Sequence, residues 1–404
     1  MTSIESKFKA LGTDNAPGQE VRSTAGDVSR LMVGEPIHGT FVDFSHGDVD
    51  AFVPTPGAFE RFQDGVEAGG RQAYTEYRGS ATIRDEVAAR LATFTGASVS
   101  SEDGLIITPG TQGALFLAMA SVIAADDKVA IVQPDYFANR KIVEFLGGRI
   151  LPVQLDYFTS EGRAGFDVEQ LREAFDAGAK VLVFSNPNNP TGAVYSSKEI
   201  HEIAQVAGEY GATVVVDQLY SRLLYSDAEY THLRAQDVDG EHVVTIMGPS
   251  KTESLSGYRL GVAFGSKHII SRMEKLQAIV SLRAPGYSQA VLRTWFNEPM
   301  GWMAERIRLH ESIRDDLLRI FREARLNVRK PQAGSYLFPQ LPALRVRTLD
   351  FVRLLRLQAD VTVTPGSEFS PHTAGSIRLN FSQDPVAAAA AARRIVEMTS
   401  RYQT

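Results

Sequence analysis

Short apolar runs alternate with helical patterns through the middle of the chain. Six runs rich in apolar residues predict strands, at Gly104–Thr108, Val129–Gln133, Lys180–Ser185, Thr213–Asp217, Val243–Met247 and Gly261–Gly265. Helical spacing predicts helices over Asp167–Ala177 and Ser197–Tyr210, the second ended by Gly211. Strands this apolar, separated by helices, are typical of an α/β fold with a mostly parallel sheet covered on both faces. Ligands of such sheets bind at the carboxyl ends of the strands.

The two ends of the chain have different patterns. Long helix patterns cover Ser266–Ser281 and about Gly301–Ala324. Beyond them, a smaller α+β domain is predicted by short strands and helices at Ser335–Phe338, Thr348–Ala359, Ser376–Phe381 and Pro385–Arg401. The first forty residues are polar and weakly periodic, which predicts an extended arm or a flexible entry segment. We therefore expect an N-terminal arm and part of the small domain in residues 1–50, a large domain in 51–295 and a small C-terminal domain in 296–404.

Composition narrows the functional class. The 404 residues carry 42 Lys and Arg against 48 Asp and Glu, a net charge of -6, so no basic surface for nucleic acid is expected. The longest apolar stretch, Leu115–Ala125, is too short to cross a bilayer, and residues 1–10 hold no apolar signal core. Cysteine is absent, which excludes disulfides and thiolate metal sites, and no metal is expected. These features favour a soluble cytoplasmic enzyme.

Four local features carry candidate chemistry, and each has an ordinary interpretation when it is taken alone. They are the run Ser-Asn-Pro-Asn-Asn-Pro-Thr-Gly at 185–192, Asp217 with Tyr220 three residues on, Lys251 within 248–261, and Arg378 in a predicted strand. Asn-Pro pairs mark turns, and most lysines are solvated. In this order and spacing, however, they resemble the fold-type I aminotransferases, in particular the aspartate aminotransferase-like class. The resemblance runs from about Phe41 to the C-terminus.

The resemblance implies pyridoxal 5′-phosphate (PLP) as the cofactor. PLP is an electron sink that the protein must bind, protonate and orient. Lys251 matches the lysine that forms a Schiff base with PLP and then moves a proton between the substrate Cα and the cofactor. Asp217 matches the partner of the pyridinium nitrogen. Asn189 and Tyr220 match the residues that hydrogen-bond the phenolic oxygen.

A phosphate site is expected between a strand and the apolar helix that begins near Ala114. Gly110, Thr111 and Gln112 place their backbone amides there, and the N-terminus of a helix binds anions readily. Arg259, eight residues after Lys251, matches the phosphate arginine of the family.

One position departs from the family pattern. Family members often have Ser three residues before the lysine, and this chain has Gly248. Ser250 is an alternative source of that phosphate contact.

Two tyrosines match aromatic positions around the cofactor. Tyr136 stands where the family stacks a ring on the pyridine, although a tyrosine of the core is the alternative. Tyr74 matches the tyrosine that reaches the phosphate of a neighbouring subunit, with Tyr77 as a competing candidate. The match implies a homodimer with shared active sites.

Substrate recognition is implied for Asn189 and for four further residues. Arg378 matches the arginine that binds the α-carboxylate, a task that suits the planar guanidinium. Gly47 resembles the glycine of a flexible gate, and His46 stands where the family usually has an apolar residue, so that a structural histidine is the alternative. Arg283 falls one residue from the arginine that dicarboxylate-specific members lend across the dimer, and a solvated arginine is the alternative.

The interpretation is therefore a PLP-dependent aminotransferase that exchanges an amino group between an α-amino acid, acidic if Arg283 has the proposed role, and a 2-oxo acid. One alternative is another PLP reaction on the same scaffold, such as a lyase, cyclase, γ-replacement or oxidase reaction. A second is a non-catalytic effector-binding domain of a DNA-binding regulator. Residues 1–40 are too short for its DNA-binding domain, and the retained pair Lys251 and Asp217 also argues against it.

Overall fold

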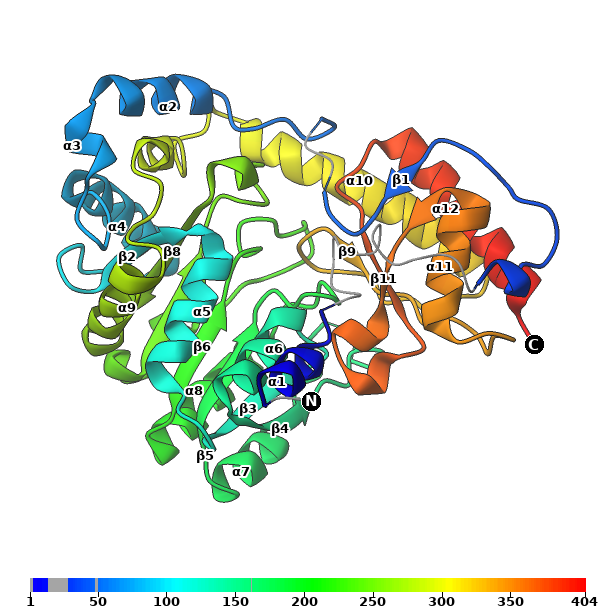
Figure 1. The fold of residues 1–404 in the computed structure, drawn as a ribbon, viewed down its shortest axis with the longest axis horizontal. Helices are drawn as coiled ribbons and strands as arrows, with labels where there is room; N and C mark the ends of the chain where they lie inside the picture. Colours follow the sequence, from blue (N-terminus) through cyan, green and yellow to red (C-terminus); the bar gives the residue numbers. More distant parts are fainter. Residues whose placement is uncertain (1–2, 14–27, 48–49, 161) are drawn as a thin grey trace.

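A seven-stranded mixed sheet forms the centre of the larger of two bodies (Figure 1). The computed structural model describes residues 3–13, 28–47, 50–160 and 162–404. In the order β2-β8-β7-β6-β5-β3-β4, the sheet is formed by β2 (Leu105–Pro109), β8 (Leu260–Gly265), β7 (Val243–Met247), β6 (Thr213–Asp217), β5 (Ala179–Ser185), β3 (Lys128–Gln133) and β4 (Arg149–Gln154). Of these seven, β8 runs antiparallel to both neighbours and the other pairs are parallel. The prediction of a mostly parallel sheet is confirmed.

The six predicted strands are present with bounds within one residue of those expected, and β6 and β7 match at both ends. The edge strand β4 was not predicted. Its sequence contains Pro152 and it is only partly buried, so it lacks the apolar run that identifies the other strands.

Helices cover both faces of the sheet. They are α4 (Ala81–Thr95), α5 (Gly110–Val122), α6 (Phe137–Leu146), α7 (Val168–Asp176), α8 (Ser197–Tyr210) and α9 (Lys267–Val280). Helices α2 (Ala58–Glu67) and α3 (Gly70–Ala73) lie beside the sheet, and α2 packs against residues 287–293. Alternate residues of a strand point to opposite faces. Val215 of β6 therefore packs with α5, α6 and α9, whereas Val214 and Val216 pack with α7 and α8. Helix α8 ends at Gly211, as predicted, where φ is +58°.

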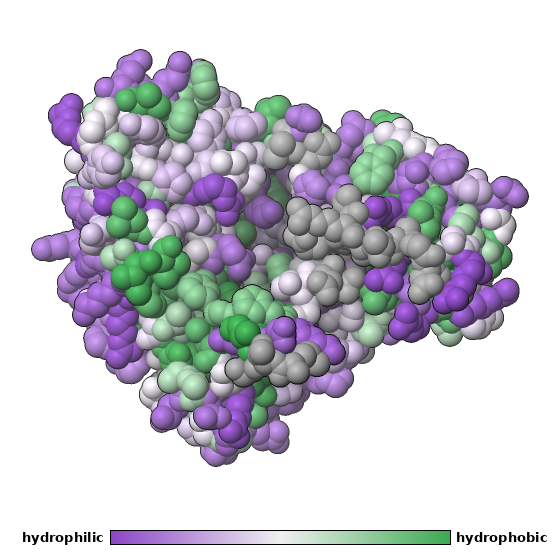
Figure 2. Space-filling model, viewed as in Figure 1, coloured by the Kyte–Doolittle hydropathy of each residue, from purple (hydrophilic) through white to green (hydrophobic). Residues whose placement is uncertain are grey.

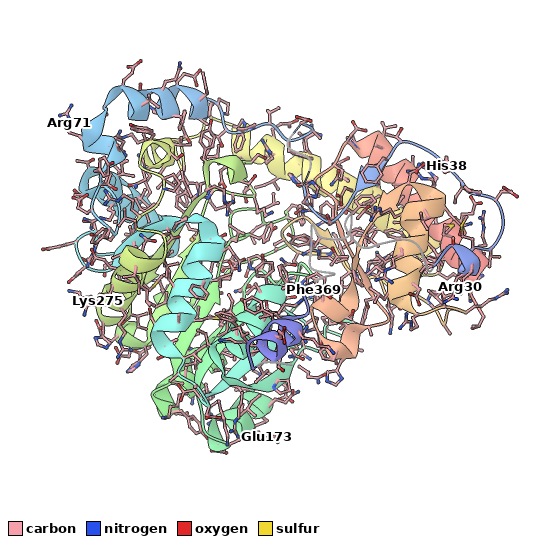
Figure 3. The ribbon with its side chains drawn as sticks, viewed as in Figure 1. Arg30, His38, Arg71, Glu173, Lys275 and Phe369 are labelled. Atoms are coloured by element: carbon pink, nitrogen blue, oxygen red, sulfur yellow. The ribbon has the colours of Figure 1, made fainter. Side chains whose placement is uncertain are left out.

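A second, smaller body contains the C-terminal part of the chain. It holds α10 (Trp302–Glu323), α11 (Thr348–Ala359), α12 (Pro385–Tyr402), a two-stranded sheet of β1 (Val42–Asp43) and β10 (Val361–Thr362), and a three-stranded sheet of β11 (Thr364–Pro365), β12 (Ile377–Asn380) and β9 (Tyr336–Leu337). One hydrophobic cluster joins Phe44 to Leu317, Leu354 and Ile395. The segment around residues 42–44 therefore packs with the C-terminal part of the chain. Figure 3 shows Phe369 between the two bodies.

The expectation of an extended or flexible arm is wrong for its first residues. Ser3–Leu11 form helix α1, which lies against α6 (Figure 1). The ring of Phe8 contacts that of Phe145, and the ammonium of Lys7 lies 4.0 Å from the centre of the same ring. Ile4, Phe8 and Leu11 recur at helical spacing, a signal that the polar composition of the segment obscured. Residues 14–27 of the expected arm lie outside the described residues.

Candidate active site

A cavity of about 390 Å³ lies at the carboxyl ends of the parallel strands, between the sheet and the smaller body. Most of the residues singled out from the sequence line it: His46, Thr111, Gln112, Tyr136, Asn189, Asp217, Tyr220, Ser250, Lys251, Arg259 and Arg378. An adjoining cleft of about 900 Å³ includes Gly47 and shares Lys251 with the cavity. Residues from distant parts of the sequence thus meet at one edge of the sheet, as the α/β fold predicts.

Lys251 lies in the loop between β7 and β8. Its side chain is exposed to the cavity, which it shares with Asp217. The loop turns sharply at Ser254, where φ is +56°, and the guanidinium of Arg306 donates to the Ser254 hydroxyl at 2.9 Å. The loop therefore presents a primary amine on the floor of the cavity.

Asp217 is the last residue of β6. Its carboxylate is buried and accepts a hydrogen bond from the backbone N–H of Leu219 at 2.9 Å. Burial raises the pKa of the Asp217 carboxyl to about 6. A buried carboxylate with free acceptor capacity favours a cationic N–H partner in the cavity, because the partner's charge offsets the cost of burial.

Tyr220 pairs with a tyrosine that was not expected at the site. The hydroxyls of Tyr220 and Tyr336 lie 2.5 Å apart, and burial raises the pKa of Tyr220 well above its ordinary value. Tyr336 belongs to β9 of the smaller body and carries no motif. Only the three-dimensional packing of the two bodies reveals it.

The N-terminus of α5 forms a cradle for an anion. The helix begins at Gly110, four residues earlier than expected, so that Thr111 and Gln112 belong to its first turn. Gly110 has φ +75°, and a Cβ on it would lie 2.4 Å from Nη2 of Arg259. The guanidinium therefore lies directly against the helix N-terminus, where backbone N–H groups and a cation converge on the same space.

Ser250 and Gly248 lie beside this cradle. The Ser250 hydroxyl lines the cavity and donates to the carbonyl of Leu260 at 3.3 Å. Gly248 faces Thr111 closely enough that it has no room for a side chain.

Tyr136 forms part of the cavity wall above β3. Its hydroxyl donates to Oε1 of Gln112 at 3.0 Å, and burial raises its pKa. The residue before it, Asp135, is buried, and burial raises the pKa of its carboxyl to about 7. Asp135 was not among the expected site residues.

Arg378 is a buried arginine with partners from both bodies. Its Nη1 donates to Oδ1 of Asn189 at 3.0 Å and its Nη2 to the carbonyl of Ser45 at 2.9 Å. The guanidinium also lies 4.4 Å from the ring centre of Tyr336 and 4.8 Å from that of Phe369. Its Nε has no hydrogen-bond partner among the described residues. The arrangement leaves N–H groups available for a carboxylate.

His46 and Gly47 lie at the rim. Nδ1 of His46 is 3.4 Å from the carboxylate of Asp43, and most of its side chain is exposed. A Cβ on Gly47 would lie 3.2 Å from Cβ of Ser382. Residues 48 and 49, which follow them, are outside the described residues.

Arg283 and Tyr74 do not line the cavity of their own chain. They contact each other: the guanidinium of Arg283 lies 5.3 Å from the ring centre of Tyr74 and 5.5 Å from that of Tyr77. Arg283 is half-buried, whereas Tyr74 is 78% exposed.

Comparison with known proteins agrees with this geometry. The model of the family "Aminotransferase class I and II" matches residues 40–395. The chain belongs to this aminotransferase family. A crystal structure of an aspartate aminotransferase from Rhodobacter sphaeroides 2.4.1 is 65% identical, with a TM-score of 0.96 over 100% of both chains.

Curated relatives of this aminotransferase are more distant but extend over nearly its whole length. An aspartate aminotransferase from Musicola paradisiaca is 26% identical over 100% of this chain and 98% of its own length. An aspartate/prephenate aminotransferase from Thermus thermophilus is 28% identical over 91% of this chain and 90% of its own length.

The family membership determines the reaction class. The protein is an aminotransferase, and it exchanges an amino group between an α-amino acid and a 2-oxo acid. The alternative PLP reactions are not favoured by these relatives.

Proposed function

We propose that PLP binds in the 390 Å³ cavity and is held covalently by Lys251. The observation that carries the proposal is one cavity that combines a primary amine, the buried Asp217 carboxylate, and the N-terminus of α5 with Arg259. These groups fit the cofactor. The cradle at Gly110 suits a phosphate, the carboxylate suits a protonated ring nitrogen, and Tyr136 offers a ring for stacking.

Each residue then has a chemical task. Bound PLP supplies an electron sink for the bonds at the substrate Cα. Asp217 keeps a proton on the ring nitrogen, because its charge is buried and needs a cationic partner. Tyr220 and Asn189, which line the same cavity, would hydrogen-bond the phenolic oxygen. The amine of Lys251 accepts the proton from the substrate Cα and then donates it to the cofactor.

The α-carboxylate of the substrate is assigned to Arg378. The guanidinium is fixed by Asn189 and Ser45, and it retains N–H groups for a further acceptor. Charge-assisted hydrogen bonds of this kind are among the strongest in proteins. The clamp would be common to all α-amino acids.

The active unit is proposed to be a homodimer with shared sites. Apolar and aromatic residues are exposed around α2, α3 and the end of α9, including Phe59, Val66, Tyr74, Ile279 and Leu282. Apolar side chains are visible over α2 at the upper left of Figure 2. A second copy would cover this surface and receive Tyr74 and Arg283 at the edge of its own cavity.

An acidic substrate is the finer proposal. Relatives are named aspartate aminotransferases, which supports aspartate or a similar dicarboxylate. Arg283, brought from the second copy, would bind the distal carboxylate. His46, at the rim, is a further candidate contact.

The domain division and location are also proposals. Boundaries near residues 50 and 295 are supported by the shared hydrophobic cluster of residues 28–52 with 313–402, although Tyr225 joins that cluster as well. Within the described ranges, no helix is long and apolar enough to cross a membrane. We place the enzyme in the cytoplasm.

The position of the cofactor can be tested directly. Protein purified with PLP should absorb in the visible region, and borohydride should fix the cofactor on the peptide that contains Lys251, as read by mass spectrometry. Lys251→Ala should bind PLP reversibly and lose turnover by several orders of magnitude, because the nucleophile and the base vanish together. Normal turnover in that variant would refute the proposal.

A further inference from the structure

Asp135 makes contacts that the functions assigned above do not use. Its carboxylate is 2% exposed and accepts hydrogen bonds from the backbone N–H groups of Tyr136, at 2.6 Å, and Ser185, at 2.8 Å. The hydroxyl of Ser185 also donates to it. A carboxylate so deeply buried is costly unless its acceptor sites are filled. With Nδ2 of Asn139, which donates at 3.5 Å, four donors converge here on its two oxygens.

Ser185 continues this contact toward the substrate site. Its hydroxyl oxygen accepts a hydrogen bond from the backbone N–H of Asn189 at 3.1 Å. The side-chain oxygen of Asn189 in turn accepts from Nη1 of Arg378 at 3.0 Å. Asp135, Ser185, Asn189 and Arg378 are all at least nine-tenths buried. They form a continuous chain of hydrogen bonds from the end of β3 to the C-terminal body.

The direction of each bond in this chain is fixed. The Ser185 hydroxyl has one hydrogen, and the ionised form of the Asp135 carboxyl can only accept it, so the hydroxyl oxygen is left to receive the Asn189 N–H. A neutral amide at position 135 has one acceptor oxygen and one NH₂ group. Whichever way it turned, that NH₂ would face an N–H or O–H donor. The chemistry of the position therefore requires a carboxylate.

We propose that Asp135 is a positioning residue of the aminotransferase reaction, which acts through Ser185 and Asn189 to hold Arg378 in place for the substrate carboxylate. The inference rests on the proposed role of Arg378. Because the Asp135 carboxylate also binds the N–H of Tyr136, it fixes the backbone of the residue that forms the cavity wall. Asp135 touches neither substrate nor cofactor, and its effect is on affinity for substrate.

The test separates binding from chemistry. The half-reaction with an amino-acid donor, followed by absorbance in a stopped-flow instrument, yields an apparent dissociation constant and a limiting rate. Asp135→Asn should raise the dissociation constant about tenfold or more, as expected for the loss of a charge-assisted bond, and change the limiting rate much less. Ser185→Ala should act in the same direction, and Ser185→Thr, which keeps a hydroxyl, should restore most of the affinity.

A matched control is Glu199→Gln. Glu199 is also a buried carboxylate that accepts backbone N–H bonds, from Ala164, Gly165 and Phe166, but it does not line the cavity. This variant should lower the thermal midpoint without changing the dissociation constant of the amino acid. The variant measures how the loss of a buried carboxylate with only a structural role changes the thermal midpoint and the dissociation constant.

The outcomes are distinct. Unchanged donor affinity in folded Asp135→Asn and Ser185→Ala would overturn the inference, and so would an equal effect of Glu199→Gln. If Asp135→Asn does not fold, the comparison of Ser185→Ala with Ser185→Thr decides. Failure of the proposed cofactor site would instead appear in the wild-type protein, as a missing visible band and no label on Lys251.

Discussion

The γ-methyl of Thr111 lies 2.8 Å from the position that a Cβ on Gly248 would take. Two backbone atoms are also near that position, the Cα of Gly261 and the carbonyl oxygen of Leu260, both at 3.2 Å. Contacts as short as 2.8 Å force a neighbour to move. Gly248 therefore leaves room for the side chain of Thr111 in the first turn of α5. The departure from the family pattern, Gly in place of Ser at position 248, has a steric reason.

Gly248→Ser should therefore destabilise the protein and weaken the phosphate cradle. Overpacking of a tight site costs about 1–3 kcal/mol. Thr111→Ser removes the methyl group and keeps the hydroxyl, so the double variant should recover much of the loss. Thermal midpoints and PLP dissociation constants of the two single variants and the double variant measure this coupling. Additive effects of the two substitutions would show that Thr111 is not the obstacle.

Asp217→Asn should reduce the chemical step far more than cofactor binding. The amide keeps the size of the side chain and loses the charge that retains the proton on the ring nitrogen. We expect kcat to fall by about a hundredfold or more, on the scale of a lost electrostatic contact in an active site. PLP affinity, measured by titration of the cofactor-free protein, is the comparison. A change in affinity alone would mean that Asp217 does not pair with the nitrogen.

Arg283 and Arg378 should differ in their substrate dependence. Arg378→Ala should damage every α-amino acid alike, because all of them share the α-carboxylate. Arg283→Ala should lower kcat/KM for dicarboxylates by a factor that corresponds to roughly 2–5 kcal/mol of transition-state stabilisation. The activity on neutral substrates should stay the same or improve. A panel of aspartate, glutamate and neutral amino acids measures the contrast. Equal losses on all substrates would reject the acidic assignment and leave the cofactor assignment intact.

Mixing variants tests whether sites are shared between subunits. Lys251→Ala supplies an intact Arg283, and Arg283→Ala supplies an intact Lys251. Refolded together, they should form heterodimers in which one of the two sites is complete, so activity on a dicarboxylate should reappear. Activity that stays at the level of the separate variants would place Arg283 outside the partner's site.

His310 should make stability depend on acid. It lies on α10, where Nδ1 is 2.8 Å from the carbonyl of Arg306 and Nε2 contacts the Ser382 hydroxyl. Burial lowers the pKa of His310 from 6.5 to about 4. Between about pH 6.5 and 4 the unfolded chain binds a proton that the folded chain does not, so stability is lost as pH falls through this window.

The free energy of unfolding lost across this window is about 3 kcal/mol for the stated difference in pKa. His310→Gln cannot take up the proton. The difference in thermal midpoint between wild type and His310→Gln should therefore shrink as the pH is lowered from 6.5 to 4. A constant difference across that range would show that the pKa of His310 is the same in the folded and unfolded protein.

Local sequence predicted the central strands well because β6 and β7 are buried runs with a clear apolar pattern. It could not predict the antiparallel direction of β8, since an apolar run looks the same in either direction. Most of the expected site residues meet in one cavity, because the motifs that contain them follow the ends of strands that lie side by side in the sheet. Tyr336 and Asp135 were missed, since each acts through partners that are distant in the chain, 116 positions for Tyr336 and Tyr220 and 50 for Asp135 and Ser185.

The hydrogen bond from Arg378 to the carbonyl of Ser45 spans 333 positions of the chain. During synthesis, domains fold as their segments emerge, with the N-terminal parts first. The loop with Lys251 and the end of β6 therefore leave the ribosome well before Arg378, the residue that we propose to bind the substrate, has been made. A nascent or truncated polypeptide that ends before β12 contains Lys251 but not Arg378. The proposed binding of the α-carboxylate therefore requires a chain synthesised through β12.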